Sequence, residues 1–537
     1  MRRLFRPFFL RSARPTPRAA LLIALALSLA PAAIAAAPAT PHPVFERAEF
    51  ATPASALDAA CAAQWQQLGL TPAPACSDAV FVRRAFLDVI GTLPTATETR
   101  RFLADPAPDK RRALIEALLA RDEFADYWAM KWSDLLRVKA EFPINLWPNA
   151  AQAYHRWIHT AVRDNLRYDE FARTLLTANG SNFRVGPANF YRAVQGRDPE
   201  SLARAVALTF LGERAEKWPA ARREGLAAFF AQVSYKPTGE WKEEIVFFDP
   251  ARDPGRYTAC VFPDGRAARL APGADPRAVF ADWLVARDNP FFARAFVNRA
   301  WSWFFGRGIV HEPDDLRADN PPANPALLAA LEREFVASGY DVKQLFRLIL
   351  NSQTYQRSAL APGDDPRLEA QFAVYPLRRL EAEVLIDALN QITGTTEKYS
   401  SAIPEPYTYI PETQRAIALP DGSITSSFLE TFGRAARDNG LETERNNGVT
   451  SGQRLHLLNS THIKRKLETG RGLQPLLRAK RPLPASAEDI YLTLLSRRPT
   501  DGEIAAIAAY AEGHDTRTAL LDTAWALINS AEFLYRH

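Results

Sequence analysis

Apolar residues recur along most of this chain every three or four positions, which is the period of an amphipathic helix. Such segments fill residues 54–233 and resume at residue 276. Between them, β-branched and aromatic runs are separated by Asp-Pro and Asp-Gly turn signals. The pattern predicts a mainly α, multi-helical protein in two parts with a small β insertion. The predicted divisions are a leader (1–37), a linker (38–53), a first helical region (54–233), the insertion (234–274) and a second helical region (275–537).

One segment, residues 289–334, departs from the amphipathic pattern. It opens with a predicted helix that is apolar on nearly all sides, and such a helix is buried in a soluble protein. Charged and polar residues nevertheless occur within it and in the loop that follows. Buried charges need partners, so we expect a polar network at the centre of this region. The residues concerned are Arg294, Asn298, Arg299, Asp314, Asp315, Arg317, Asp319 and Asn320.

The first 37 residues have the pattern of a signal peptide. Six arginines precede an apolar core at residues 19–30, and small residues suited to cleavage follow. The core is shorter than the roughly 20 residues that a membrane span needs, so cleaved export is favoured over anchoring. Arg2-Arg3 leaves the twin-arginine route open beside the general one. We expect a protein of the periplasm or the extracellular space, without a membrane span after cleavage.

The leader also accounts for the basic balance of the chain. It holds six of the 66 Lys and Arg residues and none of the 61 Asp and Glu residues, so the rest carries a net charge of −1 instead of +5. A near-neutral mature chain gives no electrostatic reason to expect a nucleic-acid partner.

The chain has three cysteines. In an oxidising compartment Cys61 and Cys76 are close enough in sequence to form a disulfide, which would contribute on the order of 3 kcal/mol. The alternative is that both are free buried thiols. We predict the disulfide, with Cys260 as an unpaired buried thiol.

Two interpretations of the polar residues in 289–334 stay open. Arg294 and Asn298 are four residues apart and share a helix face. They could line a pocket for an anionic or polyhydroxyl ligand, with Trp301 or Trp303 as a stacking surface. The commoner arrangement is a buried ion-pair network that holds the loop against the helix. The candidate ligand-binding residues are Arg294, Asn298, Arg299, Trp301, Arg317 and Asn320.

Carboxylates supply the candidates for catalysis. A glycosidase needs two carboxyl groups roughly 5–10 Å apart, one of them with a raised pKa. The candidates are Asp314, Asp315, Glu442 and Glu444. Other charged groups, Arg84 with Asp88 and Arg379 with Glu383, are spaced as ordinary same-helix pairs.

Histidines offer only a weak metal signal. His155 and His159 are four residues apart, but no third ligand accompanies them, so we interpret them as surface or capping residues. His456 and His462 do not share a helix face and are interpreted as structural. We predict no metal site.

Several motifs resemble a known pair of domains. Residues 77–139, with FVRRAFLDVIGTLP, resemble the planctomycete-type PSCyt domain. Residues 276–537, with NPFFARAFVNRAWSWFFGRGIVHEPDD and YDVKQLFRLILNSQTYQRS, resemble the PSD-type domain that follows it. The resemblance implies export, helical domains and an uncharacterised activity. Relatives are often encoded near secreted sulfatase-like proteins, which points to polysaccharides.

Two departures from the family pattern concern cysteine. Many relatives carry C-x-x-C-H-x-H-P where this chain has Glu213 to Pro219, and C-E-C-E-R where it has Leu441 to Arg445. Because both cysteine elements are missing, we hypothesise that they form one redox or metal site in relatives. The hypothesis predicts that residues 213–217 and 441–443 lie close together. It also argues against covalent haem, and we predict no cofactor.

The best functional expectation is therefore binding or processing of an envelope or extracellular polysaccharide, with a sulfated polymer included. The alternative is a non-catalytic structural or assembly partner of a secreted sulfatase-like enzyme. Electron transfer is disfavoured because the haem-attachment cysteines are absent.

Overall fold

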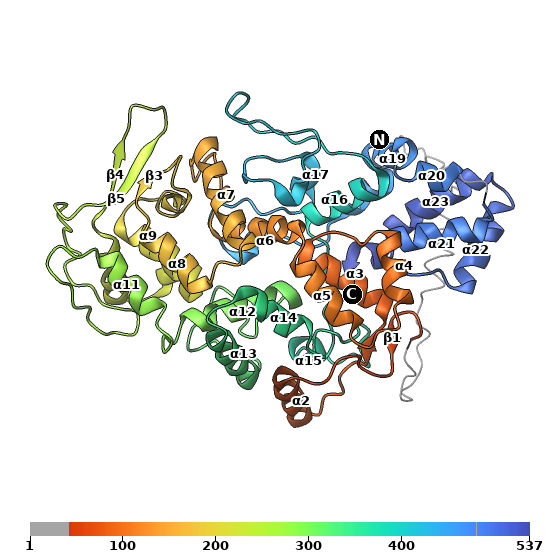
Figure 1. Ribbon diagram of the computed structural model, residues 1–537, viewed down its shortest axis with the longest axis horizontal. Coiled ribbons are helices and arrows are strands. Elements are labelled where there is room, and N and C mark those ends of the chain that lie inside the picture. The colour runs from red at the N-terminus through yellow and green to blue at the C-terminus, as the bar shows by residue number, and fades with distance from the viewer. Residues whose placement is uncertain (1–41, 479–480) are drawn as a thin grey trace, which may run out of the picture.

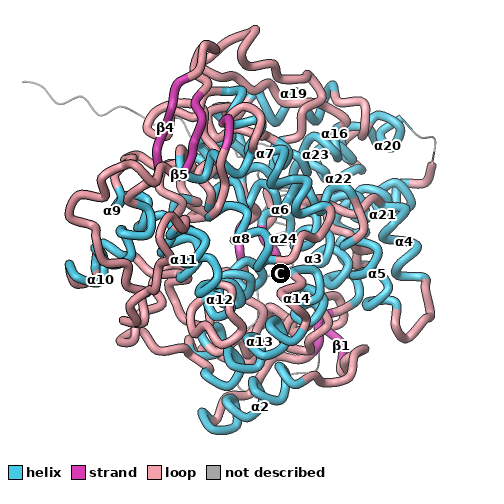
Figure 2. The backbone as a smooth tube through the Cα atoms, turned by 60° about the vertical axis from the view of Figure 1, so that its left-hand side comes forward, coloured by secondary structure: helices cyan, strands magenta, loops and turns pink. Residues whose placement is uncertain are grey.

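The computed structural model describes residues 42–478 and 481–537, and helices make up most of it (Figures 1 and 2). The mainly α prediction is confirmed. In this part of the chain no helix combines the length and the apolarity needed to cross a bilayer. The predicted leader, 1–37, lies outside the described residues.

The first helical region contains α-helices that follow one another with short connections. Helices α2, α3, α4 and α9 begin at a Ser, Thr or Asp whose side chain accepts a hydrogen bond from the first turn, as Ser77 does from Val80 in α3. The helices are α2 (Ala56–Leu68), α3 (Asp78–Ile90), α4 (Ala96–Ala104), α5 (Lys110–Leu119), α6 (Asp122–Leu135), α7 (Pro148–Arg163), α8 (Tyr168–Leu176), α9 (Pro199–Val206) and α10 (Ala220–Ala227), with short helical turns η1 (Gly186–Tyr191), η2 (Ala207–Leu211), η3 (Ala215–Lys217) and η4 (Ala228–Phe230).

The second helical region begins at α11 and contains the buried helix α12. Its helices are α11 (Pro276–Leu284), α12 (Phe292–Phe305), α13 (Pro325–Ala337), α14 (Val342–Leu350), α15 (Arg367–Ala370), α16 (Ala382–Thr393), α17 (Ser427–Thr431), α18 (Ser451–Asn459), α19 (Thr461–Thr469), α20 (Gln474–Arg478), α21 (Leu483–Leu494), α22 (Asp501–Ala511), α23 (Thr516–Ile528) and α24 (Ala531–Leu534), with turns η5 (Ala416–Ala418) and η6 (Glu442–Glu444).

The β insertion is confirmed in its first half. Strands β4 (Val233–Pro237) and β5 (Glu244–Phe248) form an antiparallel hairpin, and β3 (Gly180–Ser181) pairs with the other edge of β5. Residues 250–274 form turns, with a single isolated bridge between Val261 and Ala267. The Asp264-Gly265 turn closes that bridge, and prolines nearby remove the donors that longer strands need.

The described part of the predicted linker is attached to the fold. Strand β1 (Glu46–Arg47) pairs with β2 (Ala75–Cys76). Ser77 then donates hydrogen bonds from its backbone to Phe45 O and from its side chain to Val44 O. Residues 42–53 are therefore not a free spacer.

The two helical regions share one apolar core that runs from Leu57 to Phe533. Helices α2 and α5 contact α13 and α14, and α4 contacts α21. The C-terminal strand β7 (Tyr535–Arg536) pairs with β6 (Arg378–Arg379), and Arg83 of α3 donates to Phe533 O. The division along the sequence is thus not a division in space.

The predicted disulfide is wrong, because Cys61 and Cys76 are both free and buried. The Cys61 thiol is held on α2 beside Thr354, and burial raises its pKa to about 12. The Cys76 sulfur lies 3.9 Å from Nη1 of Arg111, so a guanidinium occupies the space beside it. Cys260 is also a buried free thiol.

Candidate functional site

Helix α12 lies at the centre of the second region, and 13 of its 14 residues are buried. Trp301 is 0% exposed and stacks on Phe305 with ring centroids 4.2 Å apart. Trp303 is also buried, beside Trp128 and Trp132. The prediction that Trp301 or Trp303 offers a stacking surface to a ligand is therefore wrong, since both indoles belong to the core.

Arg299 and Asp314 form the ion pair at the centre of the predicted network. Their side chains are each 1% exposed, and Nη2 of Arg299 lies 2.9 Å from Oδ1 of Asp314. Arg299 also donates to Thr209 O and Leu208 O in η2, both at 3.0 Å. The second oxygen of Asp314 accepts the backbone N–H of Glu442 at 2.7 Å. This pair joins three segments that are distant in sequence.

The two asparagines hold the loop after α12. The amide of Asn298 accepts from Val310 N at 2.8 Å and donates to Val310 O at 3.0 Å. Asn320 donates to His311 O and Asp315 O. Arg294 points away from this network, is half exposed and pairs with Glu332 of α13. The predicted Arg294–Asn298 binding face is wrong, because only one of the two residues faces the loop.

The outer part of the loop is an exposed ion-pair chain. Asp315 accepts from Lys217 at 3.1 Å and from Arg317 at 2.9 Å, and Arg317 also reaches Asp319. Partial burial raises the pKa of Asp315, but the hydrogen bonds from Lys217 and Arg317 outweigh it and leave that pKa below its ordinary value. Asp315 is thus an ionised acceptor and does not suit a general acid.

The other two candidate carboxylates are already engaged. Glu442 accepts the indole N–H of Trp303 at 3.3 Å, and burial raises its pKa, with Asp314 adding to the effect. Glu444 accepts the backbone N–H groups of residues 438–440 and so fixes that turn. Neither is free to work as half of an acid–base pair in this arrangement.

The predicted approach of residues 213–217 to 441–443 is confirmed. Arg214, Glu216 and Leu441 line one cavity of about 350 Å³, which we name the arginine cavity. Leu316 donates to Gly212 O, and Lys217 pairs with Asp315, so the loop after α12 connects the two segments. The cavity is lined by Arg137, Val194, Gln195, Gly196, Ser201, Arg204, Ala205, Leu208, Arg214, Glu216, Asp438, Asn439 and Leu441.

Arg137 is the most unusual residue at this cavity. It follows α6 with a φ of 58° and is only 3% exposed. Its Nε and Nη1 donate to Ala193 O and Leu135 O, whereas its buried Nη2 has no partner among the described residues. Arg214 likewise has a buried Nε without a partner there. Both residues line the cavity, and each carries one N–H group that is covered by protein and unpaired within the described residues, which is rare for buried N–H groups.

Sequence reasoning missed Arg137 and Arg204, because they lie outside the 289–334 segment. The only signal available was the position of Arg214 in the segment that replaces a cysteine motif of relatives. Arg204 is exposed on α9 and donates to Ser201 at 2.7 Å.

A second polar network lies where the two regions meet. Within it, the predicted same-helix pairs Arg84 with Asp88 and Arg379 with Glu383 are replaced by other partners. Asp88 does not pair with Arg84: it accepts from Arg378 and Arg536, both at 3.1 Å, and from two tyrosines. Arg84 instead donates to the carbonyls of Tyr355, Arg357 and His537.

The same network includes Glu381 and Glu383. Glu381 pairs with Lys131 at 2.7 Å and with Arg536, and although burial raises its pKa, these cations hold the pKa of Glu381 well below its ordinary value. Glu383 is buried and pairs with Arg445 at 2.6 Å instead of Arg379. Both carboxylates lie at the start of α16 and are buried, and each is paired with cations from other segments of the chain.

The two histidine pairs, His155 with His159 and His456 with His462, do not form one cluster of metal ligands. His159 contacts Asp126 at 3.1 Å, whereas His155 is buried and its Nε2 has no partner among the described residues. His456 contacts His462, which in turn contacts Glu397. Within residues 42–478 and 481–537 no three His, Cys, Asp or Glu side chains are grouped as metal ligands.

These features define a helical protein with a buried ion-pair centre and an arginine-lined cavity beside it. Two family models match the chain: PSCyt2, a protein of unknown function (DUF1549), over residues 56–217, and PSD1, a protein of unknown function (DUF1553), over residues 276–511. The chain therefore belongs to the proteins in which a PSCyt2 region is followed by a PSD1 region. No curated protein and no solved structure matched it.

Proposed function

We propose that this protein is exported and binds an anionic polysaccharide, with sulfated polymers as the preferred class, at the arginine cavity. The observation that carries the proposal is that three arginines, Arg137, Arg204 and Arg214, line one cavity of about 350 Å³. A sulfate or carboxylate group in this cavity would accept charge-assisted hydrogen bonds from guanidinium groups such as those of Arg204 and Arg214. Export rests on the signal-like leader in the sequence.

The charges around the cavity favour an anion. Three arginines line it against two carboxylates, those of Glu216 and Asp438. Asp438 is already paired with Lys139 at 2.6 Å, so its charge is offset from outside the cavity. Guanidinium groups match the planar, bidentate geometry of sulfate and carboxylate better than ammonium groups do.

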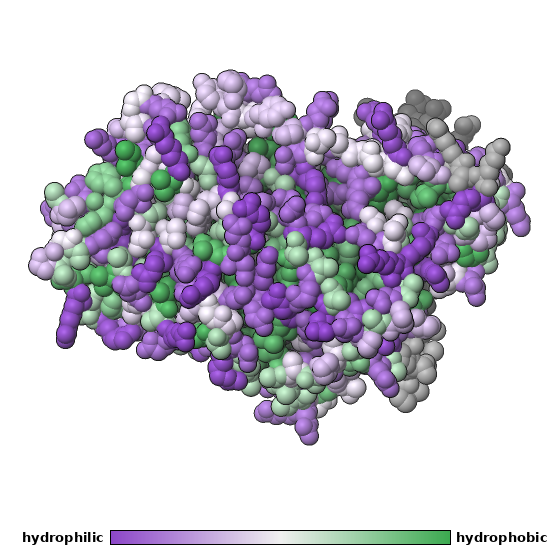
Figure 3. Space-filling view, viewed as in Figure 1, coloured by the Kyte–Doolittle hydropathy of each residue, from purple (hydrophilic) through white to green (hydrophobic). Residues whose placement is uncertain are grey.

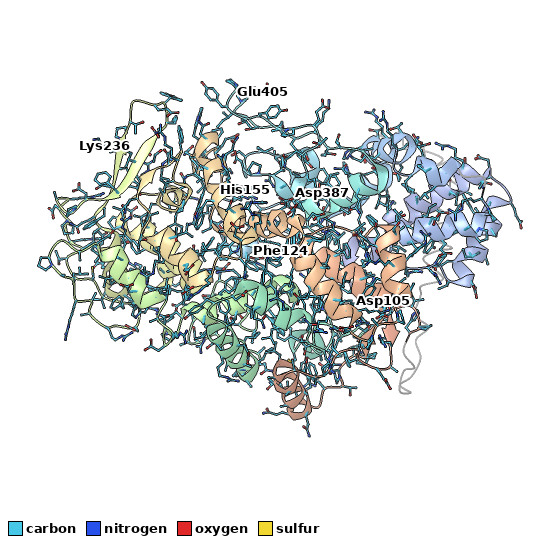
Figure 4. All side chains as sticks on the ribbon, viewed as in Figure 1. Asp105, Phe124, His155, Lys236, Asp387 and Glu405 are labelled. Carbon is cyan, nitrogen blue, oxygen red and sulfur yellow. The ribbon has the colours of Figure 1, made fainter. Side chains whose placement is uncertain are left out.

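Exposed aromatic side chains on and around residues 139–147 favour a polymer over a free anion. Phe142 and Trp241 are 79% and 68% exposed, and Trp147 packs against Tyr407 at 5.2 Å. The surface comprises Phe142, Trp147, Trp241, Tyr407 and Tyr409. The hairpin and the loop that carry its outer members project from the same side of the molecule, where Figure 4 labels Lys236 and Glu405.

A single loop links this aromatic surface to the arginine cavity. Trp147 N donates to Ala140 O and Leu146 N donates to Lys139 O, so residues 139–147 form a closed loop. Lys139 at its start pairs with Asp438 of the cavity. Sugar rings have apolar faces that pack on aromatic side chains, so one chain could place a charged group in the cavity and neighbouring rings on this surface.

Hydrolysis by the four predicted carboxylates, which do not line this cavity, is disfavoured. Glu442 and Glu444 are engaged by Trp303 and by backbone N–H groups, and Asp314 is paired with Arg299. No two of the four candidate carboxylates stand free to act as a general acid and a nucleophile or base.

The test compares three polysaccharides with one backbone: sulfated, carboxylated and neutral. We expect the sulfated form to bind the purified mature protein at least tenfold more tightly than the neutral form, measured by isothermal titration calorimetry. Arg204→Gln and Arg214→Gln should each weaken that binding about 10- to 150-fold, because a hydrogen bond to a charged group is worth about 1.5–3 kcal/mol. Added salt should weaken it further.

Arg163→Gln serves as the control. Arg163 is an exposed arginine of α7 that pairs with Asp164 and does not line the cavity. Its variant should bind like the wild type. Equal binding of the sulfated and neutral forms, or no loss in the two cavity variants, would overturn the proposal and leave the role of a non-catalytic partner of a secreted enzyme.

A further inference from the structure

A second cavity, also of about 350 Å³, lies where the PSCyt2 and PSD1 regions meet. We name it the seam cavity. One wall comes from the α3–α4 connection, α4 and the start of α6, and the other from α16 and residues 395–415. Its volume falls within the roughly 300–1,000 Å³ typical of small-molecule sites.

Most of the residues that line the seam cavity have polar side chains, although carbon atoms of these side chains also face the space. Thirteen of the fourteen residues around it are threonines, side-chain amides, carboxylates or arginines, and Leu93 is the exception. An apolar ligand would leave these groups without partners, at a cost of about 1–3 kcal/mol for each buried one. The lining therefore selects for a ligand rich in hydrogen-bonding groups.

Two arginines face three carboxylates in the seam cavity. Arg121 donates to Glu98 at 2.8 Å and to Glu123 at 2.6 Å, so this arginine and the two glutamates are mutually satisfied. Arg415 lies 3.8 Å from Asp387, which leaves one further opposite pair. No excess of cations faces the space, in contrast to the arginine cavity, so an anionic ligand gains little there.

The uncharged groups keep unused hydrogen-bonding capacity. Gln391 donates its amide to Leu93 O at 2.9 Å, which leaves its oxygen as an acceptor. Gln414 likewise donates to Arg415 O and Ala418 O and keeps its oxygen. The hydroxyl of Thr413, on an exposed loop position, both donates and accepts. Mixed donors and acceptors without net charge match the hydroxyl groups of a sugar.

Asp387 is the most buried of the carboxylates that line the seam cavity. It lies on α16 (Figure 4), is 6% exposed and accepts the backbone N–H groups of Ala416 and Ile417. Burial raises its pKa to about 6, while Arg415 and the two N–H groups act against that rise. The carboxyl fixes the 395–415 wall to α16 and thereby gives the cavity a defined shape.

We infer that the seam cavity binds a neutral polyhydroxylated ligand, a short oligosaccharide, between the two family regions. The inference does not depend on the anionic ligand proposed for the arginine cavity, because the two cavities share no lining residue. A ligand held by both walls would also stabilise the packing of the two regions against each other.

The experiment uses the full mature protein and a panel of neutral cello-, xylo-, manno- and malto-oligosaccharides. Saturation-transfer NMR identifies a binder, and calorimetry measures its affinity. The double variant Gln391→Leu with Thr413→Val should reduce that affinity at least tenfold, since it removes an amide and a hydroxyl while keeping side-chain size. Saturating ligand should raise the thermal unfolding midpoint of the wild type but not of the variant.

Thr97→Val is the matched control, because Thr97 is an exposed threonine of α4 that does not line the cavity. It should bind like the wild type, and so should Arg214→Gln, which separates this site from the arginine cavity. Circular dichroism should show that the double variant folds. Absence of any binder at millimolar concentration, or equal affinity of the double variant and the wild type, would overturn the inference.

Discussion

At the scale of single residues, the polar side chains of the buried helix α12 show what the pattern of apolar and polar positions can and cannot predict. Arg299 is buried and paired with Asp314, as expected of a charge on an apolar helix. Arg294 lies five residues earlier yet is half exposed. The pattern requires partners for buried charges, but it does not show which of two arginines faces the core when the helix is apolar on nearly all sides.

The Arg299–Asp314 pair should therefore matter for stability, and Arg294 should not. Arg299→Ala leaves Asp314 as an unpaired buried charge and removes the bonds to Leu208 O and Thr209 O. We expect the free energy of unfolding to fall by about 3–5 kcal/mol. Arg294→Ala on the same helix removes a surface pair and should cost about 0–1 kcal/mol. Urea unfolding followed by circular dichroism measures both, and similar losses would contradict the assignment.

At the scale of elements, the end of α12 is fixed by a strand that lies far away in the sequence. Gly306 caps the helix with a φ of 72°, which an L side chain rarely adopts. The side chain of Arg378, on β6, packs against Gly306 and donates hydrogen bonds to the carbonyls of Trp303 and Phe304. The carbonyl groups at this helix end, which have no helical partners, are thus satisfied by a guanidinium from a distant strand.

Gly306 should accordingly tolerate no side chain. A Cβ added there would lie 2.3 Å from Cδ of Arg378, inside van der Waals contact. Gly339 provides the comparison, because its φ is 70° but nothing lies within 4 Å of an added Cβ. Gly339→Ala should cost about 1–2 kcal/mol for the backbone alone. Gly306→Ala should cost about 1–3 kcal/mol more. Equal thermal unfolding midpoints for the two variants would refute the close packing.

At the scale of the whole molecule, the sequence predicts the class and some distant contacts but not the common core. Helical periodicity identifies most helices. The absence of both cysteine motifs of relatives led to the correct prediction that residues 213–217 and 441–443 lie close together. The predicted disulfide is wrong, because the cellular compartment and the sequence spacing do not determine the directions in which the two thiols point. The arginine and seam cavities could not be predicted, because each is formed by segments that meet only after folding, such as Arg137 with Arg214.

Burial of uncharged titratable groups across this core should also make the whole molecule sensitive to acid. His155 on α7 is 9% exposed, and burial, with Arg437 and His159 nearby, lowers its pKa to about 3 (Figure 4). The unfolded chain takes up this proton near the ordinary pKa of about 6.5, whereas the folded chain does not. Stability should therefore fall as pH drops from about 6.5 towards 3.

Hydrophilic side chains cover much of the face in Figure 3, interspersed with apolar ones, whereas His155 is buried beneath the surface. His155→Leu removes the buried imidazole and should make the acid loss smaller. Between pH 7.5 and pH 4.5 the wild type should lose about 2–3 kcal/mol more unfolding free energy than the variant. Between pH 7.5 and pH 9 the two should change alike, because the imidazole is neutral in both folded and unfolded chains. Urea unfolding at the three pH values measures this, and other groups, His537 included, cancel in the difference. Parallel acid losses in both proteins would show that His155 is not buried as the structure places it.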